Sequence, residues 1–163
     1  SVWQPTRYRD SGRRKRGEIK QNMKALIDTC VVIDFLQKRE PFAATSKEIF
    51  FAAATDQFSG YITAKSATDI YYLMHRCTHS DKASRKLLNQ LFSLIGMLDT
   101  SAEDIFHALT SETTDFEDAV MIETAIRTHV DYLITRNTKD YAKSPVPICS
   151  PDQFMEILKD EMA

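Results

Sequence analysis

The stretch that most constrains the fold of this chain is an apolar run that ends on an acid and passes directly into a second apolar run. Residues 24–28 read Lys-Ala-Leu-Ile-Asp, and residues 29–36 continue Thr-Cys-Val-Val-Ile-Asp-Phe-Leu. The first run has the length of a buried strand and the second that of a helix. Ligands of open α/β sheets bind outside the carboxyl ends of the strands. Asp28, at the junction, is therefore expected to face a site.

The rest of the chain repeats this alternation of apolar strands and amphipathic helices. We expect strands at residues 24–28, 58–63, 97–100, 132–135 and 146–149. We expect helices at residues 30–38, 43–56, 66–74, 81–95, 101–110 and 115–129, and from 150 onward. Thr29 is predicted to cap the first helix. Ser101, with an acid three residues on, is predicted to cap the helix at 101–110, and Ser150 the last helix, with Pro151 at its first position. This order predicts a mostly parallel sheet that helices cover on both faces.

The size and composition of the chain favour one globular domain. A chain of 163 residues can bury a core without disulfides. It contains no apolar run of membrane-spanning length and no signal-peptide core, so we expect a cytoplasmic protein. The three cysteines, at positions 30, 77 and 149, are odd in number and far apart, which argues against a disulfide framework and a Cys-x-x-Cys zinc site.

The basic groups are unevenly placed along the chain. Residues 1–22 carry seven basic groups against two acidic ones, whereas the rest carries 14 basic against 21 acidic. We expect residues 1–22 to be a flexible extension and residues 23–163 to be one domain. The extension is either a nucleic-acid-binding arm or sequence upstream of a natural start at Met23, and we favour the second reading. A polyanionic substrate would need positive charge from a divalent metal, a local basic patch or a basic partner, because the body is acidic.

Polar side chains recur at the ends of separate predicted elements. They are Asp28 at a strand end, Asp69 and Asp118 at helix starts, and Asn137 with Asp140 beyond another strand end. Parallel strands end at the same edge of the sheet, so these groups are expected to meet. Each acid alone is also an ordinary cap or first-turn residue. Converging carboxylates repel unless a cation is present, and oxygen ligands without His or Cys select Mg²⁺ or Mn²⁺. Phosphodiester hydrolysis suits such a site.

Four pieces of the sequence, taken together, resemble a known family. They are Leu-Ile-Asp-Thr-Cys-Val-Val-Ile-Asp at 26–34, Ala-Thr-Asp-Ile-Tyr-Tyr at 67–72, Asp-Phe-Glu-Asp-Ala at 115–119 and Leu-Ile-Thr-Arg-Asn-Thr-Lys-Asp-Tyr at 133–141. In this order and spacing they resemble the PIN-domain nucleases, especially the VapC-like toxin branch, over about residues 23–158. The resemblance implies a three-layer α/β/α sandwich, metal-dependent endoribonuclease activity, an inhibiting antitoxin and a possible homodimer.

The resemblance also implies roles for individual residues. Asp28, Asp69 and Asp118 match the catalytic, metal-binding acids of the family. Asn137 stands at the fourth catalytic position, where the family usually has aspartate. Asp140 and Asp115 are the nearby carboxylates that we expect to compensate for it as metal ligands.

Five further residues are candidates for supporting roles, each with a plainer alternative. Thr29, directly after the first acid, either supports the site or only caps the first helix. Asp34 either supports the site or lies on a solvated helix face. Thr135 either orients water or metal through its hydroxyl or only ends a strand. Arg136 and Lys139 either bind RNA phosphates or are simply solvated.

Two other functions compete with the nuclease reading. A PIN-like module with weak or no catalysis, which binds RNA or protein, is consistent with Asn137 and the acidic body. A small-molecule phosphatase would use the same aspartates, but Cys30 stands where its acid/base aspartate is needed, two residues after Asp28. Charge complementarity predicts that an antitoxin partner inserts an Arg or Lys into the acidic site.

Overall fold

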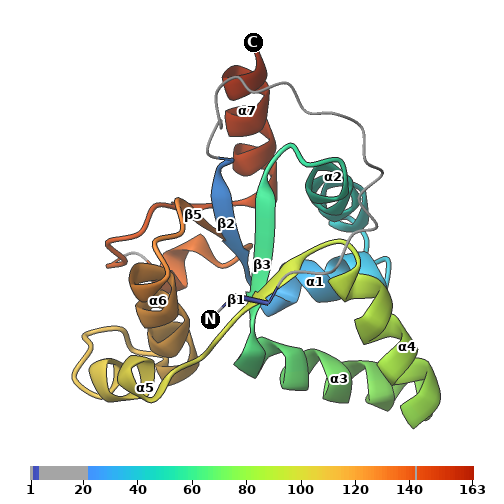
Figure 1. Ribbon diagram of the computed structural model, residues 1–163, viewed down its shortest axis with the longest axis horizontal. Coiled ribbons are helices and arrows are strands. Elements are labelled where there is room, and N and C mark those ends of the chain that lie inside the picture. The colour runs from blue at the N-terminus through green and yellow to red at the C-terminus, as the bar shows by residue number, and fades with distance from the viewer. Residues whose placement is uncertain (1, 4–21, 142) are drawn as a thin grey trace.

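The computed structural model describes residues 2–3, 22–141 and 143–163 of the chain, and within them it contains six strands and seven α-helices (Figure 1). The strands are β1 (Val2–Trp3), β2 (Lys24–Ile27), β3 (Ser59–Thr63), β4 (Gly96–Leu98), β5 (Tyr132–Ile134) and β6 (Ile148–Cys149). The helices are α1 (Thr29–Leu36), α2 (Ala43–Ala54), α3 (Ala64–Thr78), α4 (Asp81–Phe92), α5 (Ala102–Ala108), α6 (Phe116–Arg127) and α7 (Pro151–Met162). A 3₁₀ turn, η1 (Thr138–Tyr141), follows β5.

The strands form one sheet in the order β1-β4-β3-β2-β5-β6. β2 lies inside the sheet, where Leu26 is in register with Tyr61 of β3 and Leu133 of β5, and both pairings are parallel. The pairings β3–β4 and β5–β6 are parallel as well, and of the strands described here only β1 runs antiparallel, along β4. The mostly parallel sheet predicted from the sequence is therefore confirmed. The antiparallel edge strand was not predicted, and residues 4–21 of the expected extension lie outside the described residues.

Helices cover both faces of the sheet and make the three layers. Alternate residues of a strand point to opposite faces. Ala25 and Ile27 of β2 accordingly join the core with α1, α2, α3, α4 and α7, whereas Leu26 joins the core with α6. α5 packs on α6 through Ala108, which meets Ala119 and Val120. Figure 1 shows α5 and α6 on one side of the sheet and α1 to α4 on the other. The three-layer α/β/α architecture is confirmed.

Hydrogen bonds at the helix ends correct several predicted boundaries. Asp28, not Thr29, is the N-cap of α1, because its Oδ1 accepts the N–H of Thr29. α3 begins at Ala64, two residues earlier than predicted, because Thr63 caps it; Asp69 therefore lies in the second turn. The predicted caps Ser101 and Ser150 are present, both as capping boxes. Within the described part of the chain, no helix is long and apolar enough to cross a membrane.

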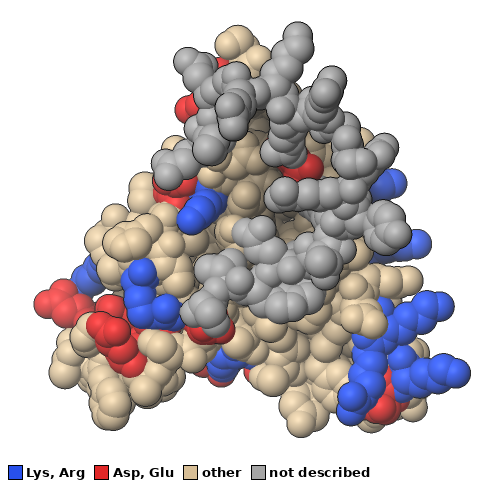
Figure 2. Space-filling model, in the orientation of Figure 1, with Lys and Arg blue, Asp and Glu red and all other residues tan. Residues whose placement is uncertain are grey.

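Basic side chains gather on the outside of α4. Lys82, Arg85 and Lys86 are exposed on this helix, and Figure 2 shows blue side chains together over it. Arg85 forms an ion pair within the same helix, since its Nε lies 2.9 Å from Asp81 Oδ2. A local basic patch therefore exists on an otherwise acidic body, on the side of the sheet opposite to α5 and α6.

Candidate functional site

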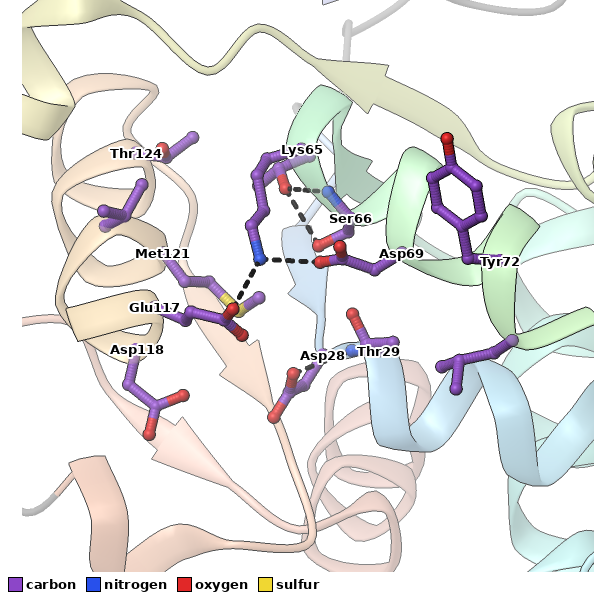
Figure 3. Close-up of a pocket in the computed structure, with 13 residues that line it drawn as sticks. Asp28, Thr29, Lys65, Ser66, Asp69, Tyr72, Glu117, Asp118, Met121 and Thr124 are labelled. Atoms are coloured by element: carbon purple, nitrogen blue, oxygen red, sulfur yellow. Dashed lines mark hydrogen bonds and ion pairs between the residues drawn. The ribbon is translucent and has the colours of Figure 1, made fainter. Parts of the chain in front are cut away.

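An acidic cleft of about 360 Å³ lies beside the carboxyl ends of β2 and β3 and the N-terminal turns of α3 and α6. Four carboxylates line it, and Figure 3 shows them facing the same space: Asp28, Asp69, Glu117 and Asp118. Topology explains the convergence, because β2 and β3 are parallel neighbours that end at one edge. The structure therefore brings together three of the acids that the sequence singled out.

Hydrogen bonds from the main chain and from side chains hold Asp28 in place. Its Oδ1 accepts the main-chain N–H of Thr29 at 2.7 Å, and its Oδ2 accepts the Thr135 hydroxyl at 2.7 Å. The Tyr141 hydroxyl lies 3.2 Å from the same Oδ2. Thr135 is fully buried at the end of β5, so its hydroxyl fixes the orientation of Asp28.

Asp118 shares the Tyr141 hydroxyl with Asp28. The hydroxyl lies 2.8 Å from Asp118 Oδ1, and because it has one proton it donates to one carboxylate at a time. Partial burial raises the pKa of Asp118 to about 6, helped by the charges of Asp115, Asp28 and Asp140 and opposed by the Tyr141 hydrogen bond. Burial beside the two acids also raises the pKa of Tyr141, which stays a neutral donor. Asp28 and Asp118 thus form an acid pair bridged by one hydroxyl.

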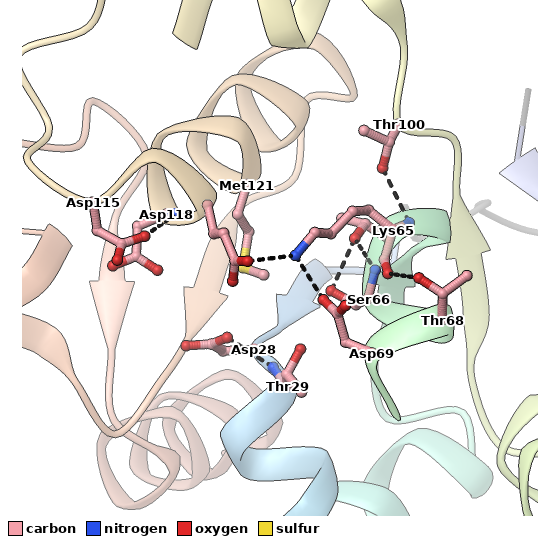
Figure 4. A network of polar contacts seen from close by, with 12 residues as sticks. Asp28, Thr29, Lys65, Ser66, Thr68, Asp69, Thr100, Asp115, Asp118 and Met121 are labelled. Atoms are coloured by element: carbon pink, nitrogen blue, oxygen red, sulfur yellow. Dashed lines mark hydrogen bonds and ion pairs between the residues drawn. The ribbon is translucent and has the colours of Figure 1, made fainter. Parts of the chain in front are cut away.

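Asp69 and Glu117 form a second acid pair, bridged by an ammonium. Lys65 Nζ lies 2.7 Å from Asp69 Oδ2 and 3.2 Å from Glu117 Oε1. Figure 3 shows Lys65 between Asp69 and Glu117, and Figure 4 shows its side chain reaching from α3 toward α6. Burial lowers the pKa of Lys65, but the hydrogen bonds to Asp69 and Glu117 outweigh it and raise the pKa overall. Lys65 therefore carries its positive charge in this position.

The other predicted ligands lie outside the lining of the cleft. Asp115 is the N-cap of α6, and its Oδ1 accepts the main-chain N–H of Asp118 at 3.0 Å. The main-chain N–H of Asn137 donates to the Thr135 hydroxyl at 3.1 Å, and the residue is exposed. Asp140 is exposed in η1, from where its charge raises the pKa of Asp118.

Arg136 and Asp34 form an ion pair outside the lining of the cleft. Arg136 Nε lies 2.6 Å from Asp34 Oδ2, and the guanidinium stacks 4.0 Å above the centre of the Phe42 ring. Asp34 is completely buried, so its reading as part of a solvated face is wrong. The proposed contact of Arg136 with RNA would compete with this pair. Lys139 is exposed, as a phosphate-binding residue would have to be.

The donor atoms of the cleft suit a hard divalent cation, because all four side chains are carboxylates. In the described parts of the chain, however, no three His, Cys, Asp or Glu side chains are gathered closely enough to hold a metal ion. The chemistry of the donors fits Mg²⁺ or Mn²⁺, while their arrangement is that of two separate pairs.

Sequence reasoning missed two residues that line this cleft, Lys65 and Glu117, and a third, Tyr141, that bonds to two of its acids. Glu117 directly precedes Asp118, and Tyr141 ends the motif at residues 133–141, so their positions in the motifs could have pointed to them. Lys65 lies just before the helix predicted at residues 66–74, so its pairing with Asp69, four residues on, was not considered, and its second partner, Glu117, lies on another helix, α6.

Comparisons with known proteins agree with this architecture. A sequence model described as PIN domain matches residues 24–139. The VapBC2 complex from Rickettsia felis, bound to a promoter DNA fragment, contains a chain of similar structure, with 16% identity and a TM-score of 0.62, over 78% of this chain and 98% of that one.

Two further solved structures have the same fold at low identity. A chain of a toxin–antitoxin complex from Klebsiella pneumoniae is 24% identical with a TM-score of 0.58, over 78% of this chain and 97% of that one. VapC20 from Mycobacterium tuberculosis is described as a toxin that cleaves the sarcin-ricin loop. It is 11% identical with a TM-score of 0.58, over 73% of this chain and 94% of that one. The comparison with curated protein sequences gives no match.

Proposed function

Because this chain belongs to the PIN-domain family, we propose that it is a metal-dependent endoribonuclease, the toxin of a toxin–antitoxin pair. The observation that carries the proposal is the meeting of Asp28 and Asp118 at the Tyr141 hydroxyl, in a cleft that also holds Asp69. The choice of RNA as substrate is supported by the similar fold of VapC20, a toxin described as cleaving the sarcin-ricin loop.

Asp28, Asp69 and Asp118 are the residues that would hold Mg²⁺ or Mn²⁺, and Asp140 and Asp115 are proposed as weaker, outer contributors. When bound, such an ion lowers the pKa of a water and stabilises negative charge on the phosphodiester oxygens. Thr135 and the N–H of Thr29 keep Asp28 in one orientation. Because preorganised ligands do not have to be ordered during the reaction, these supports favour binding at this corner.

An aromatic side chain of the cleft and basic side chains outside its lining would contact the RNA. Tyr72 lines the cleft and is 69% exposed, which leaves its ring free to stack on an unpaired base. Lys139 and the basic side chains of α4, Lys82 and Lys86, are exposed and able to contact phosphates. These contacts would supplement the metal in attracting a polyanion to an acidic body.

Cleavage assays with purified protein test the proposal. Structured RNAs are incubated with Mg²⁺, with Mn²⁺ or with EDTA, and the assay is repeated with Asp28→Asn. We expect specific cleavage that needs the metal and falls at least about a hundredfold in the variant. Asp160→Asn, an exposed position on α7, is the matched control and should retain activity. Cleavage that persists in EDTA or in Asp28→Asn would contradict the mechanism.

A second candidate function is an RNA- or protein-binding module with weak or no catalysis. The specific observation in its favour is the Lys65 ammonium, which neutralises part of the acidic cleft, together with the uncharged Asn137. Calorimetric titration with Mg²⁺ separates the two functions. Binding that Asp118→Asn abolishes supports the nuclease, whereas absence of binding at millimolar metal supports the module.

The proposed partner is a small antitoxin that places an Arg or Lys against the acidic cleft. Support comes from charge complementarity and from similar folds found in toxin–antitoxin complexes. We also propose a homodimer, by analogy with the family. Copurification with the product of the adjacent reading frame, and loss of cleavage in that complex, are the expected results. Full activity in the presence of that product would refute the partner.

A further inference from the structure

The cleft contains its own cation. Lys65 lies between carboxylates of two different helices, Asp69 on α3 and Glu117 on α6. The side chains of Lys65 and Asp69 are 38% and 41% exposed, so the contact lies at the mouth of the cleft and not in the core. The Lys65 ammonium neutralises negative charge of the cleft that a bound divalent ion would otherwise neutralise.

The local backbone makes this placement costly without the acids. Lys65 is the second residue of α3, where the N-terminal end of the helix dipole disfavours a cation. Its main chain is fixed, since its N–H donates to the Thr100 hydroxyl at 3.3 Å. The side chain nevertheless turns toward α6. The two carboxylates are therefore what holds the ammonium at this position.

The bridge also accounts for the division of the acids into two pairs. Tyr141 joins Asp28 to Asp118, and Lys65 joins Asp69 to Glu117. As long as Asp69 is bonded to Lys65, it is drawn toward Glu117. A metal ion bound to Asp69 would share this carboxylate with the Lys65 ammonium. The two positive charges would then lie a few ångströms apart and would repel each other strongly.

We propose that Lys65 is an internal cation that holds Asp69 in the metal-free protein and is displaced from it when a divalent ion binds. The inference rests on the proposed metal dependence and adds a competing residue to it. Metal binding and the Lys65–Asp69 contact then exclude each other. In consequence, the ammonium released from Asp69 remains at the cleft mouth.

Metal affinity gives the first test. Mg²⁺ is titrated calorimetrically into the unsubstituted protein and into Lys65→Met. Lys65→Met lacks the two partly exposed ion pairs that compete with the metal for Asp69 and Glu117. We therefore expect its affinity for Mg²⁺ to be about tenfold higher than that of the unsubstituted protein. Lys143→Met is the matched control, because Lys143 pairs with the exposed Glu112 and the same charge is removed outside the cleft lining. Equal affinity in all three proteins would overturn the proposal. Lys65→Gln repeats the test if the Met variant does not fold.

Direct observation of the Lys65 ammonium gives the second test and separates displacement from a general charge effect. Lysines are dimethylated with ¹³C and followed by NMR as Mg²⁺ is added. We expect the Lys65 signal to move to its Asp69→Asn position at metal saturation, while the Lys143 signal stays unchanged. A bound metal with an unchanged Lys65 signal would overturn the inference and leave the nuclease proposal standing. Absence of metal binding in the unsubstituted protein and in Lys65→Met would overturn both.

Discussion

Replacement of Asp118 by Asn is expected to stabilise the metal-free protein while it removes metal-dependent function. Folding places Asp118 beside Asp28 and partly buries it, which raises its pKa from 3.8 to about 6. The charged carboxylate is therefore disfavoured in the folded state. An amide has the same shape, keeps an oxygen that accepts the Tyr141 hydroxyl, and carries no charge.

The pKa values set the magnitude and the pH window of this effect. A difference of about two pKa units corresponds to about 3 kcal/mol, at about 1.4 kcal/mol per unit, when Asp118 is fully ionised. The side chain is only half-buried, so solvent screening reduces our expectation to about 1–2 kcal/mol. Because the pKa of Asp118 is higher in the folded state than in the unfolded state, this group contributes stability that is fully present below pH 3.8. That contribution is lost as the pH rises through about 6. Asp118→Asn has no such loss.

Thermal unfolding measures the effect. In EDTA at pH 7.5 the variant should melt roughly 2–8 °C above the unsubstituted protein, and the gain should shrink at pH 4.5. Saturating Mg²⁺ should reverse the order, because a ligand at a hundred times its Kd adds about 2.7 kcal/mol to a protein that binds it. A variant that is less stable than the unsubstituted protein in EDTA at pH 7.5 would refute the reasoning, as would a gain independent of pH.

Three further outcomes follow from the contacts around the cleft. Arg136→Met should destabilise the protein by about 3–5 kcal/mol in urea unfolding, because Asp34 is left buried and unpaired. Unchanged stability would mean that the ion pair with Asp34 is not the main role of Arg136. Tyr141→Phe should raise the pKa of Asp118 above about 6 in a ¹³C NMR titration, because the lost hydrogen bond lowered it; an equal or lower pKa would contradict that role. Tyr72→Ala should weaken binding of single-stranded RNA in EDTA by about tenfold or more, with Tyr72→Phe near the unsubstituted value, and equal binding by all three would exclude stacking.

The stretch at residues 24–36 shows how much of the fold was predictable. Its apolar run, its acid and its second apolar run are local features, and they predicted β2, Asp28 at the strand end and α1 to within two residues. The caps Ser101 and Ser150 were predictable for the same reason, since a cap is recognised a few residues from the helix that it begins. The strand β1 was not, because its partner β4 lies more than 90 residues away in the sequence.

The sequence by itself determined that Asp28 ends a strand and that Asp118 lies in the first turn of a helix. The fold then placed these two acids and Asp69, which lies in the second turn of α3, around one cleft. Only the tertiary structure decided how they are partnered: Tyr141 between Asp28 and Asp118, and Lys65 between Asp69 and Glu117. The physical reason is that hydrogen bonds and ion pairs act over a few ångströms in space. Lys65 and Asp69 are four residues apart on α3, but Glu117 comes from α6, and Tyr141 of η1 lies more than 20 residues from both acids that it joins.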